Sequence, residues 1–209
     1  MGAFQDLIFS TTGGGNLTVY LPLEELGTET PVNIGNAGTA ATITHTNTIG
    51  QQSSIVYGEN FSMEYPSVAS TNGALGDEDP LALIRLWCHF DVGEVNADII
   101  SFGDSADPTY DIRLYIENSV IKVDALSNTY TSSLTMVPDA KHYLNIFFES
   151  SGLIPWVNEN SAGVLVTDAI FNNYVYDWFK LGSGATFDVL VDESGDTLQD
   201  QSGNNLIEV

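Results

Sequence analysis

Acidic residues gather in two stretches that the sequence pattern assigns to loops. The two groups are Asp104, Asp107 and Asp111, and Asp77, Glu78 and Asp79. Carboxylate oxygens on loops are the hard ligands that Ca²⁺ prefers. Neither group has the spacing of an EF-hand loop, and Asp is also a residue that turns favour. The first group therefore carries two hypotheses, a calcium site or ordinary turns, and no cofactor is required.

A second set of residues combines aromatic rings with hydrogen-bonding groups, which is the chemistry that a glycan site needs. The set consists of Trp87, His89, Arg113 and Tyr115. Alternation along the expected strands directs these side chains outward on a polar face. The competing interpretation is that the rings cover a sheet edge or meet a neighbouring subunit, because aromatic residues are enriched at interfaces.

The sequence lacks the usual signatures of catalysis. It has no Gly-x-Ser-x-Gly motif and no phosphate-binding loop, and its histidines, His45, His89 and His142, are widely spaced. Cys88 is the only cysteine, which excludes an intrachain disulfide and the usual Cys/His zinc site. Because Cys88 lies within an apolar strand pattern, we expect it to be a small buried hydrophobic residue. The sequence predicts a protein that is not an enzyme.

The charge balance limits the partners of the chain. Charged residues make up 16% of it, against roughly 25% in an average globular protein. Lys and Arg number 5 and Asp and Glu number 28, which gives a net charge of −23. Such a surface repels phosphate backbones and anionic lipids, and no segment approaches a membrane span. We therefore expect neither a nucleic-acid partner nor membrane insertion, and we attribute the charge to solubility or saline surroundings in preference to a cationic partner.

The elements that position these residues are short strands. From residue 54 to residue 192 the chain alternates between apolar and polar side chains in segments separated by Gly, Asn, Asp, Ser and Pro. This pattern is typical of an antiparallel sandwich. Strands are expected at 81–91, 98–102, 111–116, 120–124, 142–148, 155–158, 164–167, 178–181 and 187–192, with a short one at 41–45.

Three of these strands have a clear inner face. The expected core residues are Ala82, Ile84, Leu86, Cys88 and Phe90 in the first, Ile112, Leu114 and Ile116 in the second, and Leu144, Ile146 and Phe148 in the third. With 209 residues, the chain suits one all-β domain. We place this domain at residues 16–192, preceded by an N-terminal arm or first strand at 1–15 and followed by a polar tail at 193–209.

Several motifs, in their order and spacing, carry a resemblance to a known family. They are YLPLEELG at 20–27, IISFGD at 99–104, IRLYIEN at 112–118, PDAKH at 138–142, LNIFF at 144–148, WVN at 156–158, KLG at 180–182 and FDVLVD at 187–192. This series resembles the laminin-G-like domains of the concanavalin A-like lectin/glucanase superfamily. The resemblance implies an all-β fold, an antiparallel jelly-roll β-sandwich of the concanavalin A-like type.

The glucanase branch of that superfamily carries two Glu and one Asp alternating on one strand, which places paired carboxylates on the same face. The nearest approaches in this chain are residues 188–193 and 59–64, and neither has that alternation. The resemblance therefore implies a binding or structural domain in preference to a hydrolase.

Domains of this type normally work outside cells, whereas this sequence begins at Met1 without a secretory signal. Release by lysis reconciles the two observations. The first hypothesis is thus a virion structural or decoration protein, in the capsid surface, a fibre or the tail, that contacts other virion subunits as a homo-oligomer and also attaches to cell-surface glycans. The alternatives are an extracellular carbohydrate-binding lectin or adhesin and, third, a glycoside hydrolase or lyase.

Overall fold

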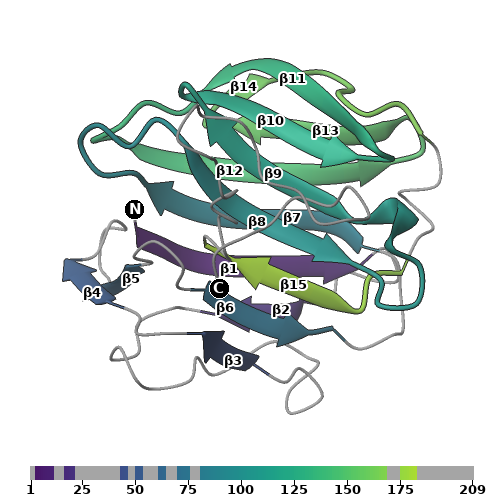
Figure 1. Cartoon of the computed structure of the whole chain (residues 1–209), viewed down its shortest axis with the longest axis horizontal. Helices are drawn as coiled ribbons and strands as arrows, with labels where there is room; N and C mark the ends of the chain where they lie inside the picture. Colours follow the sequence, from purple (N-terminus) through teal and green to yellow (C-terminus); the bar gives the residue numbers. More distant parts are fainter. Residues whose placement is uncertain are drawn as a thin grey trace, which may run out of the picture.

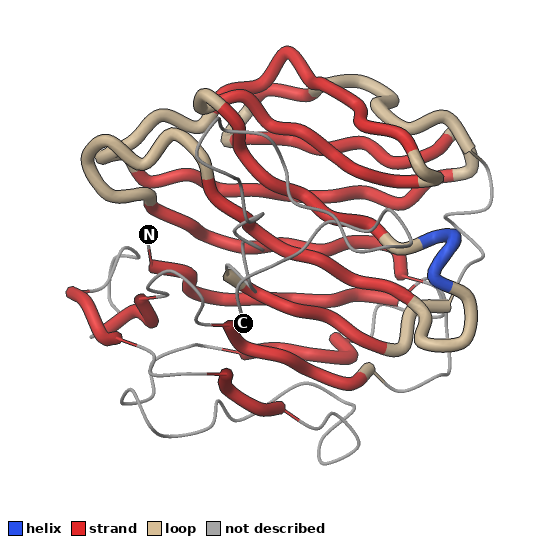
Figure 2. Tube along the Cα trace, viewed as in Figure 1, coloured by secondary structure: helices blue, strands red, loops and turns tan. Residues whose placement is uncertain are grey.

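Two antiparallel β-sheets, packed face to face, make up the described chain (Figure 1). The computed structural model describes residues 3–11, 17–21, 43–46, 50–53, 61–64, 70–75, 81–168 and 175–182. Within these residues every named element is a strand except one short 3₁₀ turn, η2 (Pro108–Tyr110) (Figure 2). The predicted all-β class and the antiparallel sandwich are therefore confirmed.

The first sheet, sheet A, has eight strands within the described residues. Their order is β14-β13-β12-β7-β1-β5-β4, and β2 also pairs with β1. The strands are β1 (Ala3–Thr11), β2 (Leu17–Leu21), β4 (Gly50–Ser53), β5 (Phe61–Glu64), β7 (Leu81–His89), β12 (Lys141–Glu149), β13 (Gly152–Val157) and β14 (Asn160–Ser161). The segment 1–15 thus contributes a strand that lies between β7 and β5, as in the first-strand alternative, whereas residues 193–209 lie outside the described part.

The second sheet, sheet B, has seven described strands in the order β11-β10-β9-β8-β15-β6-β3. They are β3 (Ile43–Thr46), β6 (Ser70–Ala74), β8 (Ala97–Gly103), β9 (Ile112–Glu117), β10 (Val120–Ala125), β11 (Asn128–Thr135) and β15 (Trp178–Leu181). Two-residue turns join β9 to β10 and β10 to β11. The central residues of both turns have positive φ, with 51° and 64° at Asn118 and Ser119 and 52° and 59° at Leu126 and Ser127. This is the turn geometry that matches the twist of a β-hairpin.

The core lies between the two sheets, and the sequence alternation predicted its residues well. From sheet A, Ile84, Leu86, Cys88 and Phe90 are fully or almost fully buried, as are Leu144 and Ile146. From sheet B, the buried row is Ile112, Leu114 and Ile116. Burying each large apolar side chain contributes roughly 1.5–3 kcal/mol. Burial also raises the pKa of the Cys88 thiol far above its ordinary value, so the side chain stays neutral as expected.

Some elements differ from the expectation. The strand expected at 164–167 is wrong, since the segment contributes only an isolated bridge between Val166 and Leu153. Six of the described strands were not expected from the sequence: β2, β4, β5, β6, β11 and β14. The strand expected at 187–192 lies outside the described residues.

Candidate functional site

The four candidate ligand-binding residues lie on opposite sides of the sandwich. Trp87 and His89 belong to β7 of sheet A, and Arg113 and Tyr115 belong to β9 of sheet B. All four alternate with core residues and so face outward, away from the layer between the sheets. The single polar face expected from the sequence is therefore wrong. Alternation tells which side chains point outward, but not which sheet a strand joins.

The outer face of sheet A is aromatic. Large apolar side chains fill outward positions on three neighbouring strands, β7, β12 and β13. We call this set the aromatic face: Leu83, Trp87, Tyr143, Phe147, Ile154 and Trp156. The rings of Trp87 and Tyr143 lie 4.5 Å apart between centroids, and those of Phe147 and Trp156 lie 6.1 Å apart. Trp156 is the most exposed of them at 37%.

Polar groups complete this face. Arg85 Nε donates a hydrogen bond of 3.1 Å to Asn145 Oδ1, and the Arg85 guanidinium lies 5.4 Å from the centroid of the Tyr143 ring. His89 Nε2 lies 3.8 Å from Asp139 Oδ1 at the end of the strand. His89 is thus held at the rim of the aromatic face, beside an exposed carboxylate.

The outer face of sheet B is polar, and Arg113 lies at its centre. Arg113 Nε donates a 2.7 Å hydrogen bond to Oδ1 of Asp98, a nearly buried residue of β8, and Nη1 lies 3.5 Å from Asp124 Oδ2 of β10. The guanidinium also lies 4.5 Å from the centroid of the Tyr115 ring. One cation therefore joins three adjacent strands. The sequence search missed Asp98 and Asp124 because register alone brings them to Arg113.

The Asp124 carboxylate also accepts hydrogen bonds from two neighbouring side chains. It accepts hydrogen bonds from the Tyr115 hydroxyl at 3.2 Å and from Thr129 Oγ1 at 2.6 Å. Burial, followed by the negative charge of Asp124, raises the pKa of Tyr115 above its ordinary value. Tyr115 therefore stays protonated and donates, and the Asp124 carboxylate is held in one place.

Two open grooves flank Arg113 on this face. The larger has a volume of about 540 Å³ and is lined by Trp178, Ser101, Asp111, Asp124 and Thr129 among others. The second, of about 450 Å³, runs past Asp98, Tyr115 and Asn118. Arg113 lines both. Ligand sites are usually lined mostly by apolar and aromatic side chains with a few convergent polar groups. The larger groove combines the Trp178 ring with such polar groups.

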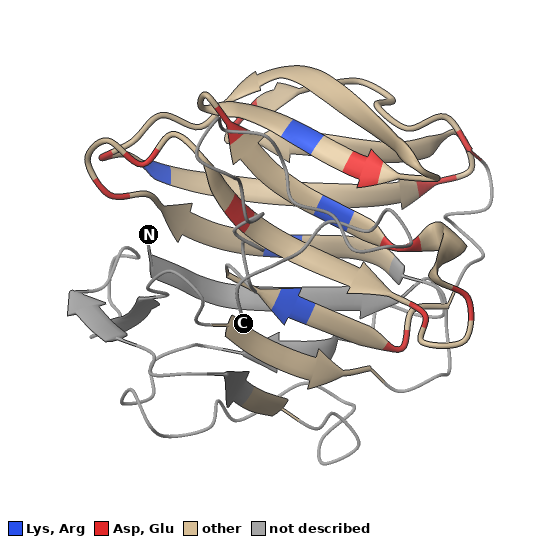
Figure 3. Cartoon of the chain, viewed as in Figure 1, with Lys and Arg blue, Asp and Glu red and all other residues tan. Residues whose placement is uncertain are grey.

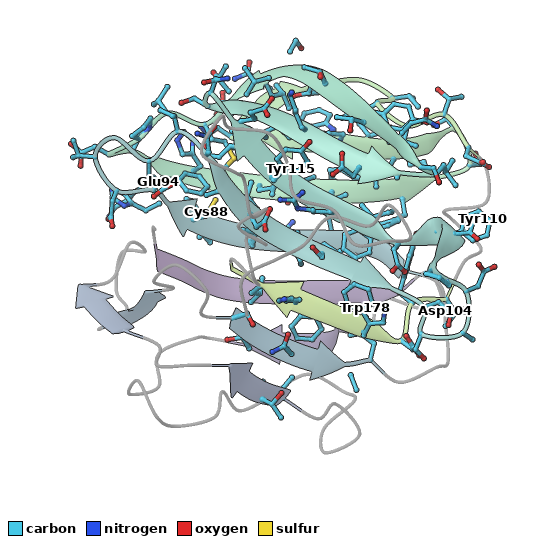
Figure 4. The ribbon with its side chains drawn as sticks, in the orientation of Figure 1. Cys88, Glu94, Asp104, Tyr110, Tyr115 and Trp178 are labelled. Atoms are coloured by element: carbon cyan, nitrogen blue, oxygen red, sulfur yellow. The ribbon has the colours of Figure 1, made fainter. Side chains whose placement is uncertain are left out.

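A glycine at the end of β8, Gly103, makes room for the Trp178 side chain that lines the larger groove. A Cβ built on Gly103 would lie 1.9 Å from Asp111 Oδ1 and 2.5 Å from Trp178 Cζ2. The absence of a side chain at Gly103 thus lets these two residues lie over the end of β8, where Figure 4 shows Trp178 near Asp104. The outward alternation of Trp178 with the buried Phe179 could have indicated this residue from the sequence.

The three candidate calcium ligands act as local hydrogen-bond acceptors. Asp104 Oδ1 accepts from the Ala106 N–H at 2.8 Å, and Asp107 Oδ1 from the Thr109 N–H at 3.1 Å at the start of η2. Asp111 Oδ1 accepts from the Asp104 N–H at 3.2 Å. Such bonds are typical of turn-forming Asp residues. Across the described part of the chain, no three His, Cys, Asp or Glu side chains are grouped so that they could hold a metal ion.

The second acidic group, Asp77 to Asp79, lies outside the described residues. In the first group, burial raises the pKa of Asp111, and the charges of Asp104, Asp177 and Asp107 raise it further, against the hydrogen bond from the Asp104 N–H. Asp177 in turn accepts from the backbone N–H and the hydroxyl of Ser105. These contacts favour the turn hypothesis, and a calcium site stays the less favoured alternative.

The cations are unevenly distributed (Figure 3). All five lie within the described residues, and three of them, Arg113, Lys122 and Lys180, are on outward positions of sheet B. Lys122 forms an ion pair with Glu117, whereas Arg85 and Lys141 belong to sheet A. The outer face of sheet B is therefore close to charge balance in a strongly acidic chain.

Comparison with protein-family models and with curated proteins gave no match for this chain. The laminin-G-like resemblance therefore stays a prediction. Among the described residues, no helix has the length and apolar character needed to cross a bilayer.

Proposed function

We propose that the chain is a non-enzymatic structural or decoration subunit of a virion, which contacts other subunits through the aromatic face of sheet A. The observation that supports this function is the filling of outward positions on β7, β12 and β13 with large apolar side chains. An antiparallel sheet that faces water normally carries polar residues there. Protein interfaces, by contrast, are enriched in Trp, Tyr and Phe.

The charges around the aromatic face agree with a subunit contact. Two chains of net charge −23 repel one another, and a contact forms most readily where acids are few. On β7 and β12 the outward positions beside the aromatic rings are held by Arg85, His89, Lys141 and Asn145, and the acid Glu149 stands only at the strand end. This face therefore suits an acidic or neutral partner surface.

The proposal includes a jelly roll of the concanavalin A-like type, in which the two sheets are layers of one domain. The shared core between them supports this reading, as does the repeated passage of the chain from one sheet to the other. No enzymatic step is assigned, since the carboxylates of Asp98 and Asp124 are both engaged by Arg113.

A second candidate function, glycan attachment, is favoured by the larger groove on sheet B. Trp178 offers a ring for stacking, and Arg113, Asp124 and Thr129 offer donors and acceptors at its walls. These are the groups that a neutral sugar requires. In this second function the chain would act as the attachment module of a particle or as an extracellular lectin.

The structural function is tested by sedimentation of particles from the native source. We expect the chain to co-sediment with them, and recombinant protein to bind particles stripped of it. Trp156→Asp places a charge on the aromatic face and should abolish rebinding. Val92→Asp is the matched control, because Val92 is 80% exposed in the turn after β7 and outside the aromatic face. A native protein found only as a free species would contradict the proposal.

A further inference from the structure

The open edge of sheet B is formed by β11. This strand is eight residues long, Asn128 to Thr135, and stands at the end of the strand order, with β10 as its only described neighbour in the sheet. The strand exposes Asn128, Thr129, Thr131, Ser133 and Thr135. A sheet edge presents a row of backbone N–H and C=O groups that can pair with another strand.

The hairpin geometry identifies which backbone groups point outward. Because the turn has two residues, Ala125 and Asn128 form the hydrogen-bonded pair that closes it. Hydrogen-bonded and non-bonded pairs alternate along an antiparallel ladder. The pairs of Thr129 with Asp124 and of Thr131 with Lys122 are therefore non-bonded. Thr129 and Thr131 direct their N–H and C=O groups away from β10, toward the open edge.

This edge lacks most of the devices that normally block pairing. Natural edges are protected by charged side chains, especially Lys, by Pro, or by bulges. From Ala125 to Val137 the sequence contains no charged residue and no Pro. A bulge is present, because Ser132 to Leu134 lie opposite the single residue Ile121. It limits the regular edge to Asn128–Thr131.

Backbone N–H groups in and next to the bulge already have hydrogen-bond partners within the chain. The Leu134 N–H donates to Ser132 Oγ at 3.0 Å, and the Met136 N–H donates to the Ser119 carbonyl at 2.8 Å. Beyond it, an open groove of about 300 Å³ separates Ser133 and Thr135 from Asn158 and Asn160. The edge is therefore accessible, and its unused pairing capacity is concentrated at Thr129 and Thr131.

We propose that β11 pairs with β11 of a second copy of the chain, antiparallel and about a twofold axis at Tyr130. This inference rests on the proposed structural function and names the second copy as a partner. The twofold axis places Thr129 of one copy opposite Thr131 of the other. Both pairs then exchange N–H···O=C bonds, which are the bonds the hairpin leaves unmade.

The segment is suited to pairing with itself. Thr–Thr pairs directly across an antiparallel ladder are favourable, and an isologous contact requires such self-complementarity. The absence of charge on β11 matters because the two copies repel one another elsewhere. Asp124, the nearest acid on β10, is already bonded to Arg113, Tyr115 and Thr129. Joined in this way, two sheets B become one continuous sheet.

The test measures self-association of the full chain by sedimentation equilibrium over a wide concentration range. We expect a monomer–dimer equilibrium that strengthens with salt, because salt screens the like charges. Thr131→Pro removes an N–H that β10 does not use and should weaken dimerisation by roughly tenfold or more. Thr131→Val keeps the N–H and should dimerise like the wild type. Far-UV circular dichroism confirms that both variants are folded.

Amide hydrogen exchange gives a second measurement that does not depend on a variant. The amides of Thr129 and Thr131 should exchange rapidly in dilute solution and become protected as the dimer forms. A wild-type chain that stays monomeric, a dimer that Thr131→Pro leaves unchanged, or unprotected amides in the dimer would each overturn the proposal. Binding of the variants to stripped particles is scored separately, so failure of the edge pairing and failure of the particle function give different results.

Discussion

The guanidinium of Arg113 binds the carboxylate of Asp98 on the neighbouring strand, with 2.7 Å between Nε and Oδ1. Asp98 is nearly buried, whereas Arg113 is about half exposed. The pair is therefore unequal. Loss of the arginine leaves a carboxylate that water reaches poorly, whereas the arginine itself can find solvent.

Arg113→Ala should consequently destabilise the fold. We expect the free energy of unfolding to fall by about 1–3 kcal/mol, as for loss of a charged hydrogen-bond partner with some solvent screening. Arg113→Lys keeps the positive charge but loses the planar guanidinium group. Its free energy of unfolding should lie between those of Arg113→Ala and the wild type. Denaturant unfolding measures the difference, and equal stability of all three proteins would contradict the assigned role.

The raised pKa of Asp111 gives a pH-dependent prediction. A group that holds its proton more tightly when folded stabilises the fold below its ordinary pKa of 3.8, and this contribution is lost as the pH rises through the folded-state pKa. At neutral pH the ionised Asp111 therefore opposes folding. Asp111→Asn keeps an acceptor for the Asp104 N–H and removes the charge.

We expect Asp111→Asn to be more stable than the wild type at neutral pH and nearly equal to it in acid. Denaturant unfolding of both proteins at neutral pH and at acidic pH measures this difference in stability. Asp107→Asn is the matched control, since it removes a charge from the same loop and should give a smaller gain. A variant less stable at neutral pH would show that Asp111 is needed as an anion, as it would be in a cation site.

Calcium is tested directly by thermal unfolding with added Ca²⁺, with added Mg²⁺ and with a chelator. Because Asp104, Asp107 and Asp111 each accept a backbone N–H, we expect the unfolding temperature to be the same in all three. A rise specific to Ca²⁺ that Asp111→Asn removes would restore the calcium hypothesis for this loop.

The two outer faces make different predictions for glycan binding. If sugars occupy the larger groove on sheet B, Trp178→Ala should weaken binding on an oligosaccharide array by roughly tenfold or more, as for loss of a stacked aromatic anchor. Trp178→Phe should retain part of it. Trp87→Ala, on the opposite face, should bind like the wild type.

Loss of binding with Trp87→Ala instead would move the site to sheet A. Release of reducing sugar by the wild-type chain would return the hydrolase alternative, with Asp111 and Asp124 as the first carboxylates to replace.

The sequence predicted inward and outward directions reliably where large apolar residues alternate with polar ones, as in β7, β9 and β12. It failed where that contrast is weak. In β11 the inward positions are held by Tyr130, Ser132 and Leu134 and the outward ones by Thr and Ser, so the alternation is faint. In β6 the strand passes beneath Phe179, whose ring lies where a Cβ on Gly73 would fall, 2.0 Å from Cε1. Small residues are required there, and they carry little strand signal.

The candidate site shows the same limit at longer range. Trp87 and Tyr115 were both expected on one polar outer face. Both side chains do face outward, but Trp87 belongs to the aromatic face of sheet A and Tyr115 to the polar face of sheet B. What separates them is the strand order, in which β7 joins β12 and β9 joins β8 and β10. That order depends on pairings between residues far apart in the chain. The Asp98–Arg113–Asp124 bridge depends on the same strand order, so no local sequence pattern predicts this bridge.

Because the core separates the outer faces of the two sheets, they look in opposite directions. A partner seated on the rings of Trp87 and Trp156 leaves the hollows beside Arg113 turned outward and unobstructed. The two outer faces therefore have a fixed relative orientation. Attachment through sheet A points the outer face of sheet B away from the partner.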